Sequence, residues 1–152
     1  MNVVTVVDLV QELKLEVITK EISLDRKITE QMISRPGMEL AGVIEYFRDS
    51  AKRRVQIIGT KEWLYLQTLD SQTRKERARV LFTEDTPVII FSKNFEIPEE
   101  MMELANETQV PMLRSQKETT VLFTSISNYL EEALSQLNQY MGYLLTSMGL
   151  EF

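Results

Sequence analysis

Apolar residues recur along this chain with two different periods, and the alternation between the periods predicts an α/β domain. Near the N-terminus, apolar residues fall on one helical face at positions i, i+3, i+4 and i+7: Val6, Leu9, Val10 and Leu13. Thr5 precedes them and is suited to cap the helix, because its hydroxyl accepts from a free backbone N–H. A helix is therefore expected from residue 6 to about residue 13.

Short apolar runs, separated by turn and cap residues, predict strands that alternate with helices. The expected strands are residues 15–18, 55–58, 88–91 and 111–114. Thr60 and Ser71 are expected to cap helices that run to about Leu69 and about Leu81, and Pro98 to open a helix that ends near Glu107. Residues 88–114 thus form a strand–helix–strand unit, which connects parallel strands right-handedly. We expect a three-layer α/β domain, with helices on both faces of a small parallel or mixed sheet.

Residues 33–42, which read I-S-R-P-G-M-E-L-A-G, predict a sharp turn followed by a helix start. Pro36 fixes its own φ and favours an extended Arg35, while Gly37 permits the positive φ that a Pro-Gly turn usually needs. The surrounding residues 21–42 predict irregular structure with brief extended pieces. Residues 41–47 are apolar enough to be buried, but the run is too short to assign to a strand or a helix.

Charge and composition exclude several classes of function. The net charge is −6 and the pI is near 4.8, which argues against general binding to nucleic acid. Two basic clusters lie among acidic residues, which favours a solvated face over a nucleic-acid patch. They comprise Lys52, Arg53 and Arg54, and Arg74, Lys75, Arg77 and Arg79. No stretch is apolar enough for a membrane span and no secretory pattern begins the chain, so a cytoplasmic location is expected.

The chain holds few groups that could perform catalysis. Without Cys or His, it has no disulfide, no thiolate metal site and none of the usual Cys or His catalysis. The adjacent pairs Glu99–Glu100 and Glu131–Glu132 are read as surface carboxylates, because neighbours on a helix do not face each other. Trp63 and Tyr65 suggest either packing or a stacking platform, and packing is favoured. No glycine pattern matches a phosphate-binding loop.

Five segments together resemble one known family: D-R-x-I-T at 25–29, the segment at 33–42, V-Q-I-I-G-T-K-E-W at 55–63, T-P-V-I-I-F at 86–91 and N-Y-L-E-E at 128–132. The chain resembles the N-terminal domain of bacterial HPr kinase/phosphorylase over residues 4–134. The resemblance implies a non-catalytic regulatory or assembly domain of a hexameric enzyme in carbon catabolite repression. It also implies that ATP and Mg²⁺ bind to a separate C-terminal P-loop domain, which phosphorylates a serine of HPr and reverses the reaction with inorganic phosphate. The implied partners are copies of the chain and that kinase domain, with HPr reached only through the kinase domain.

The turn segment is also similar to the N-terminal domains of Mur ligases, in which the matching turn approaches a uridine nucleotide. By that analogy Ser34, Arg35 and Gly37 would bind a nucleotide or a sugar phosphate. Turn chemistry alone also accounts for the proline and the glycine. The two readings differ in whether Arg35 projects into a hollow or is tied to a local carboxylate.

Residues 135–152 depart from the family pattern, so the family domain is expected over 1–134 and a non-family tail over 135–152. If synonymous codons for Tyr140 to Phe152 are regrouped one base earlier, they read H-G-V-L-V-D-V-Y-G-V-G-V, which is the family's own continuation. A frameshift is therefore expected; a vector-encoded or divergent tail is the alternative.

The last helix is expected to continue through the start of this tail to about Ser147, because no proline interrupts residues 119–152. Apolar residues recur along it at helical spacing: Leu130, Leu134, Leu137, Met141, Leu144 and Met148. This stripe must be covered, either by packing back on the domain or by self-association, and self-association is favoured.

Overall fold

The sheet has four short strands and mixed polarity. The computed structural model describes residues 3–42 and 49–149, with side chains left undescribed at 49–50 and 136–140. The strands lie in the order β1-β4-β3-β2, where β1 is Glu16–Val17, β2 is Gln56–Ile58, β3 is Ile89–Phe91 and β4 is Met112–Arg114. Strands β2, β3 and β4 are parallel, and β1 is antiparallel to β4. The expected small mixed sheet is confirmed.

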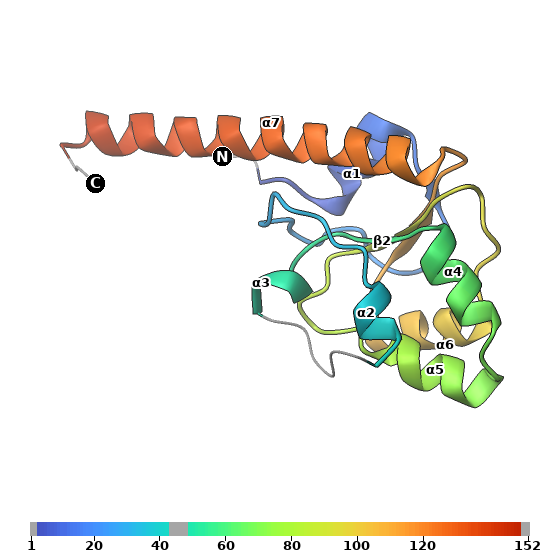
Figure 1. Cartoon of the computed structure of the whole chain (residues 1–152). Coiled ribbons are helices and arrows are strands. Elements are labelled where there is room, and N and C mark those ends of the chain that lie inside the picture. The colour runs from blue at the N-terminus through green and yellow to red at the C-terminus, as the bar shows by residue number, and fades with distance from the viewer. Residues whose placement is uncertain (1–2, 43–48, 150–152) are drawn as a thin grey trace.

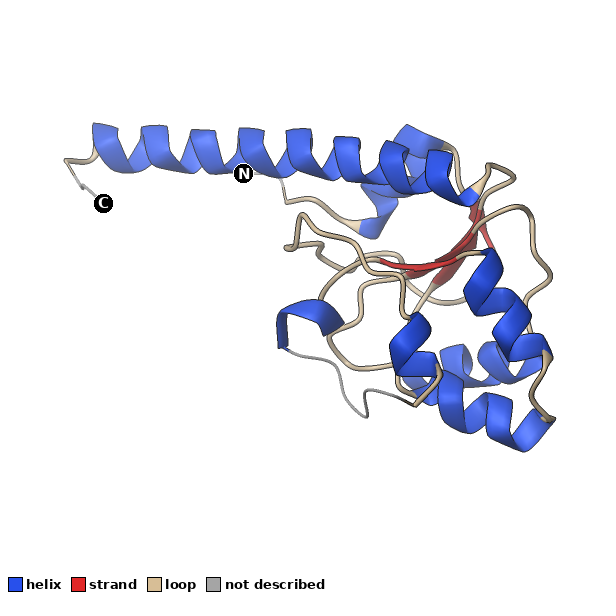
Figure 2. Ribbon diagram, viewed as in Figure 1, coloured by secondary structure: helices blue, strands red, loops and turns tan. Residues whose placement is uncertain are grey.

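Helices cover both faces of this sheet (Figures 1 and 2). One face carries α1 (Val6–Leu13) and the N-terminal half of α7 (Thr119–Ser147). The other face carries α4 (Thr60–Gln67), α5 (Ser71–Arg79) and α6 (Glu99–Thr108), with the short α2 (Gly37–Leu40) beside them. A further turn of helix, α3 (Asp49–Lys52), precedes β2. The three-layer α/β prediction is confirmed, including the crossover from β3 through α6 to β4.

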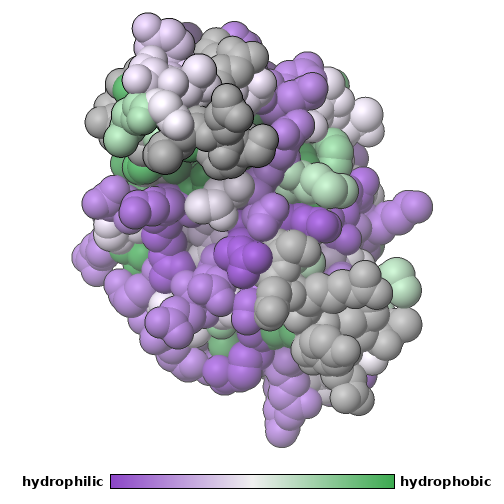
Figure 3. Space-filling model, turned by 90° about the vertical axis from the view of Figure 1, so that its left-hand side faces the viewer, coloured by the Kyte–Doolittle hydropathy of each residue, from purple (hydrophilic) through white to green (hydrophobic). Residues whose placement is uncertain are grey.

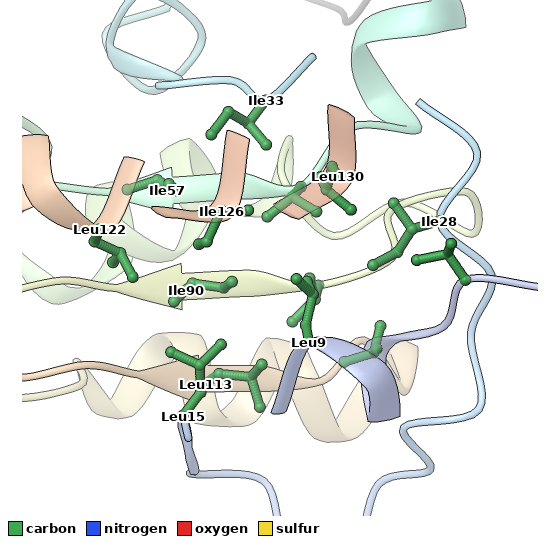
Figure 4. Packing of buried hydrophobic residues seen from close by; sticks show 14 of the residues in the cluster. Leu9, Leu15, Ile28, Ile33, Ile57, Ile90, Leu113, Leu122, Ile126 and Leu130 are labelled. Atoms are coloured by element: carbon green, nitrogen blue, oxygen red, sulfur yellow. The ribbon is translucent and has the colours of Figure 1, made fainter. Parts of the chain in front are cut away.

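Two hydrophobic cores lie on opposite faces of the sheet because neighbouring strand residues point to opposite sides. Ile57, Ile90 and Leu113 pack under α1 and α7, together with residues of both helices (Figure 4). Ile58 and Phe91 belong to the second core under α4, α5 and α6. Every residue of β2 and β3 is buried, as expected for parallel strands covered on both faces.

The first helix begins as its sequence predicts. The Thr5 hydroxyl accepts from the backbone N–H of Asp8 at 3.4 Å, and the Thr5 N–H donates to the Asp8 carboxylate at 2.9 Å. This reciprocal capping box satisfies two donors at the helix start. The caps predicted for the next two long helices are each wrong by one residue. Gly59 is the N-cap residue of α4 and Asp70 is that of α5. The Asp70 Oδ1 accepts from the N–H of Thr73 at 2.8 Å.

The turn at Pro36 differs from the prediction in its backbone. Gly37 has no positive φ and is instead the first residue of α2, with Pro36 at φ −88° before it. The positive φ of 78° occurs at Gly42, just after that helix, where a left-handed glycine commonly ends a helix. Most of the apolar run at 41–47 lies outside the described residues, so its structure stays a prediction.

The irregular segment 21–35 is held by contacts to distant parts of the chain. Arg26 donates to the backbone carbonyls of Thr86 at 2.6 Å and Gln109 at 3.0 Å. Its own carbonyl accepts from the N–H of Val6 at 3.0 Å. Burial lowers the pKa of this guanidinium from its ordinary value. One arginine therefore ties the N-terminal segment to the loops that precede β3 and β4.

Candidate functional site

The Ser34–Gly37 segment lies along the outer edge of the sheet. The Ser34 N–H donates to the carbonyl of Val55 at 2.9 Å, and its carbonyl accepts from the N–H of Ile57 at 2.8 Å. This forms a single parallel bridge between Ser34 and Gln56. Ser34 thus extends the pairing of β2 through its backbone and brings the following arginine to the carboxyl end of that strand.

Arg35 is bound by a carboxylate of the same chain. Its Nε and Nη2 donate to Glu62 Oε1 and Oε2 at 3.0 and 3.1 Å, which is a two-pronged ion pair. The Glu62 side chain is only 5% exposed, whereas that of Arg35 is 36% exposed. Glu62 Oε1 also accepts from the N–H of Gly59 at 2.9 Å. One carboxylate therefore caps α4 and fixes the arginine.

Gly59 lets this ion pair and the start of α7 approach each other closely. A Cβ at this position would lie 2.6 Å from Arg35 Nη2 and 2.5 Å from Thr119 Cγ2. The Thr119 hydroxyl in turn lies 2.6 Å from the hydroxyl of Ser92, just after β3. We call Arg35, Gly59, Glu62, Ser92 and Thr119 the carboxyl-edge cluster. It lies where the ends of β2 and β3 meet the beginnings of α4 and α7.

This geometry matches the structural reading of the turn segment, since Arg35 is tied to a local carboxylate. Ser34 contributes backbone pairing, and a Cβ at Gly37 would lie 3.9 Å from Glu62 Oε2. Ligand binding by Ser34, Arg35 and Gly37 stays a prediction. Glu62 was not among the residues predicted for this site, although Gly59-x-x-Glu62 directly after a strand has the spacing of a helix cap.

A second ion pair, largely buried, joins α5 to α6 beside a hollow of about 240 Å³. Arg74 donates to Glu100 Oε2 at 3.1 Å and to the carbonyls of Leu66 and Leu69 at 2.8 and 2.6 Å. Ser71 also donates to Glu100, at 2.7 Å. The expectation that Glu100 is a surface carboxylate is wrong, because Glu100 is only 9% exposed. Burial acts to raise the pKa of Glu100, but the hydrogen bonds from Ser71 and Arg74 outweigh it and lower the pKa below its ordinary value.

The other candidate residues also have partners within the chain. Trp63 stacks on Phe95 with ring centroids 4.6 Å apart and an interplanar angle of 7°, and its Nε1 donates to the carbonyl of Glu96 at 2.9 Å. This agrees with the packing reading of Trp63. Lys75 on α5 pairs with Glu103 and Glu107 on α6 at 3.0 and 3.2 Å, and these bonds raise the pKa of the lysine.

Three further basic residues of the two clusters also lie beside acidic side chains. Arg79 lies 3.4 Å from Glu107, Lys52 lies 3.4 Å from Asp85 and Arg53 lies 3.6 Å from Glu30. These pairs agree with the solvated-face reading of the basic clusters, from which Arg74 departs because its side chain is largely buried against Glu100. Across residues 3–42 and 49–149, no group of three or more acidic side chains is arranged to hold a metal ion. Within the same ranges, no helix is long and apolar enough to cross a membrane.

The fold is a three-layer α/β domain whose carboxyl-edge cluster closes the ends of β2 and β3. Comparison with known proteins identifies its family. The model of the HPr serine kinase N terminus matches residues 4–130, so the chain belongs to that family. HPr kinase/phosphorylase of Alkaliphilus metalliredigens is 40% identical over 149 residues, which are 98% of this chain and 47% of that protein. HPr kinase/phosphorylases of Streptococcus gordonii and Bacillus cereus are 38% and 37% identical over 97% and 93% of the chain, and 47% and 45% of their own lengths. The chain therefore spans about half the length of the curated relatives that it matches.

Proposed function

We propose that this chain is the non-catalytic N-terminal part of an HPr kinase/phosphorylase and serves regulation or assembly of the intact enzyme. The family match over residues 4–130 carries the proposal. The intact enzyme would phosphorylate and dephosphorylate a serine of HPr in carbon catabolite repression in the cytoplasm. ATP, Mg²⁺ and HPr would bind to the part of the enzyme that follows this domain.

The polar clusters of the domain support a non-catalytic role. Glu62 and Glu100 are each bound by an arginine and by a further donor. The hydrogen bonds from Ser71 and Arg74 lower the pKa of Glu100, which makes it a poor general base, and the carboxylate oxygens of Glu62 are both engaged by donors of the same chain. The hydroxyls of Ser92 and Thr119 bond to each other, with no histidine in the chain to activate either.

Two measurements test this proposal. The purified chain, mixed with HPr, ATP and Mg²⁺, is expected to transfer no phosphate; transfer that copurifies with the chain would contradict the non-catalytic role. Residues 1–134 are then grafted onto the Alkaliphilus metalliredigens enzyme in place of its own N-terminal part. Deletion of that part is expected to change the mass of the enzyme's oligomer and the regulation of its rate of HPr phosphorylation. We expect the graft to restore both. A folded graft that behaves like the deletion would reject the regulatory and assembly role.

The alternative function is binding of a nucleotide or sugar phosphate through Ser34, Arg35 and Gly37. The exposed third of the Arg35 side chain and its position at the carboxyl end of a parallel strand are the observations that favour it. A ligand phosphate would have to share or displace the Glu62 carboxylate. Calorimetric titration with uridine diphosphate and with glucose 6-phosphate decides whether such binding occurs.

A further inference from the structure

Helix α7 extends well beyond the domain that it covers. Leu122, Ile126, Leu130 and Leu134 lie in the core against the sheet, and among the side chains of α7 that the structure describes Leu134 is the last in that core. The helix then continues to Ser147, roughly 20 Å further at 1.5 Å per residue. Figure 1 shows this half of α7 running past the body with no labelled element beneath it. The projecting half has no described intramolecular layer to cover it.

The apolar stripe that packs on the domain continues along the projecting half. Its members, which we call the tail stripe, recur at spacings of three and four: Leu134, Leu137, Met141, Leu144 and Met148. Met141 and Leu144 are half-buried within the helix, whereas Met148 is 70% exposed. Figure 3 views the molecule from the C-terminal end of α7. Pale and green residues lie near the top, where α7 projects, and the body below them is mostly purple. An apolar stripe on a projecting helix marks an interaction surface.

The charge pattern indicates what covers this stripe. No Asp, Glu, Lys or Arg occurs between Glu132 and Glu151, although the chain as a whole carries a net charge of −6. An uncharged helix offers no complementarity to a charged partner, but two copies of it meet without repulsion. An antiparallel pair also places the two acidic domains at opposite ends, where their mutual repulsion is smallest.

We propose that two copies of this chain associate through their tail stripes, with the projecting halves of α7 packed side by side and antiparallel. The inference rests on the helix and its charge pattern, not on the proposed function in HPr phosphorylation. Two helical stretches of roughly 20 Å bury less area than a standard stable interface, so the association depends on protein concentration. Added salt strengthens it, because salt screens the repulsion between acidic domains and removes no attraction from an uncharged contact.

Sedimentation equilibrium of the full chain over a roughly hundredfold range of concentration tests the association. We expect the mass to rise from that of the 17.7 kDa chain toward twice this value, and to rise further in high salt. Leu144→Glu places a charge in the stripe and should leave a monomer throughout. Thr146→Glu places the same charge on the opposite, exposed side of the helix and should associate like the wild type.

Several results would overturn the proposal. A wild-type monomer at every concentration would do so, whether its tail is cleaved by protease or protected by packing on its own domain. A Leu144→Glu chain that still associates would place the contact elsewhere. Circular dichroism and thermal unfolding of both variants show whether a loss of association is a loss of fold, and Leu144 lies outside the core cluster that α7 shares with the sheet.

The orientation is tested by cross-linking, for which the absence of cysteine is an advantage. Ala133→Cys and Ser147→Cys each introduce one thiol beside the tail stripe, at opposite ends of the projecting half. When the two variants are mixed with a short bismaleimide, an antiparallel pair joins one variant to the other, because residue 133 then lies near residue 147 of the second copy. Cross-links mainly within each variant would show a parallel pair and overturn the antiparallel arrangement.

Discussion

Individual side chains hold this domain together through contacts across long stretches of sequence. Glu62 lies 27 residues from Arg35, and Glu100 lies 26 residues from Arg74. Local pattern indicates that a carboxylate is helical but cannot indicate which distant guanidinium will bind it. This is why the sequence predicted the turn at Pro36 but missed the Glu62 partner, and why Glu100 was expected at the surface.

Arg35→Ala is expected to lower the free energy of unfolding by about 1–3 kcal/mol, because it leaves the buried Glu62 carboxylate without its counter-charge. Arg53→Ala is the matched control, since its contact with Glu30 at 3.6 Å joins two partly exposed side chains and should contribute less than about 1 kcal/mol. Urea unfolding of both variants measures the difference. An unchanged Arg35→Ala midpoint, together with loss of uridine-nucleotide or sugar-phosphate binding, would favour the ligand-binding role.

Glu100 should contribute to the acid sensitivity of the fold. Its pKa is lowered in the folded chain, so it stabilises the fold above the ordinary value of 4.5 and loses this contribution as the pH falls through the folded value. Glu100→Gln should therefore lose less stability than the wild type between neutral and strongly acidic pH. Glu99→Gln, at an exposed position on the same helix, is the control. Equal acid-side slopes for wild type and Glu100→Gln in thermal unfolding would contradict this role.

Among the elements, the most regular patterns were predicted best. The helix after Thr5, the strand–helix–strand unit and the long last helix were all predicted within a few residues, because amphipathic spacing and caps are local. The short α2 was predicted only as a helix start after a glycine with positive φ. Four-residue elements leave too little periodicity to read, and tertiary packing then decides their conformation.

Gly142 offers a direct test of the projecting half of α7. It lies within this helix, and apart from its two chain neighbours and the adjoining helix backbone no atom lies within 4 Å of the place that a Cβ would occupy. Gly142→Ala should therefore stabilise the helix by about 0.5–1 kcal/mol without any clash. Far-UV circular dichroism and slower protease cleavage within residues 135–149 would register the gain. If cleavage and helicity are unchanged, the projecting half is not helical in solution.

For the molecule as a whole, the sequence predicted the layers and the mixed sheet but not how the carboxyl ends of its strands are closed. The closure depends on Gly59, where the missing side chain lets Arg35 and Thr119 approach. A single glycine after a strand suggests a close approach but does not name the approaching groups. The candidate site was therefore predicted only in its location along the chain, and its contacts required the structure.

The origin of the tail is decided by nucleotide sequence. The family model matches to residue 130, whereas the alignments to two relatives cover 97% and 98% of the chain and so reach into the tail. A frameshift predicts that the DNA after the Leu134 codon, read in another frame, encodes H-G-V-L-V-D-V-Y-G-V-G-V and then a P-loop. An unrelated reading in both other frames would show a divergent or vector-encoded tail instead.

The pairing of β1 with β4 sets an order of events during synthesis. Glu16 binds Arg114, which lies 98 residues later in the chain. At about 5–20 residues per second, the ribosome needs roughly 5–20 s to add those residues. During that interval the first strand and the apolar face of α1 have neither their sheet neighbour nor α7. The nascent N-terminal segment is therefore the part of this protein that a chaperone has the longest opportunity to bind.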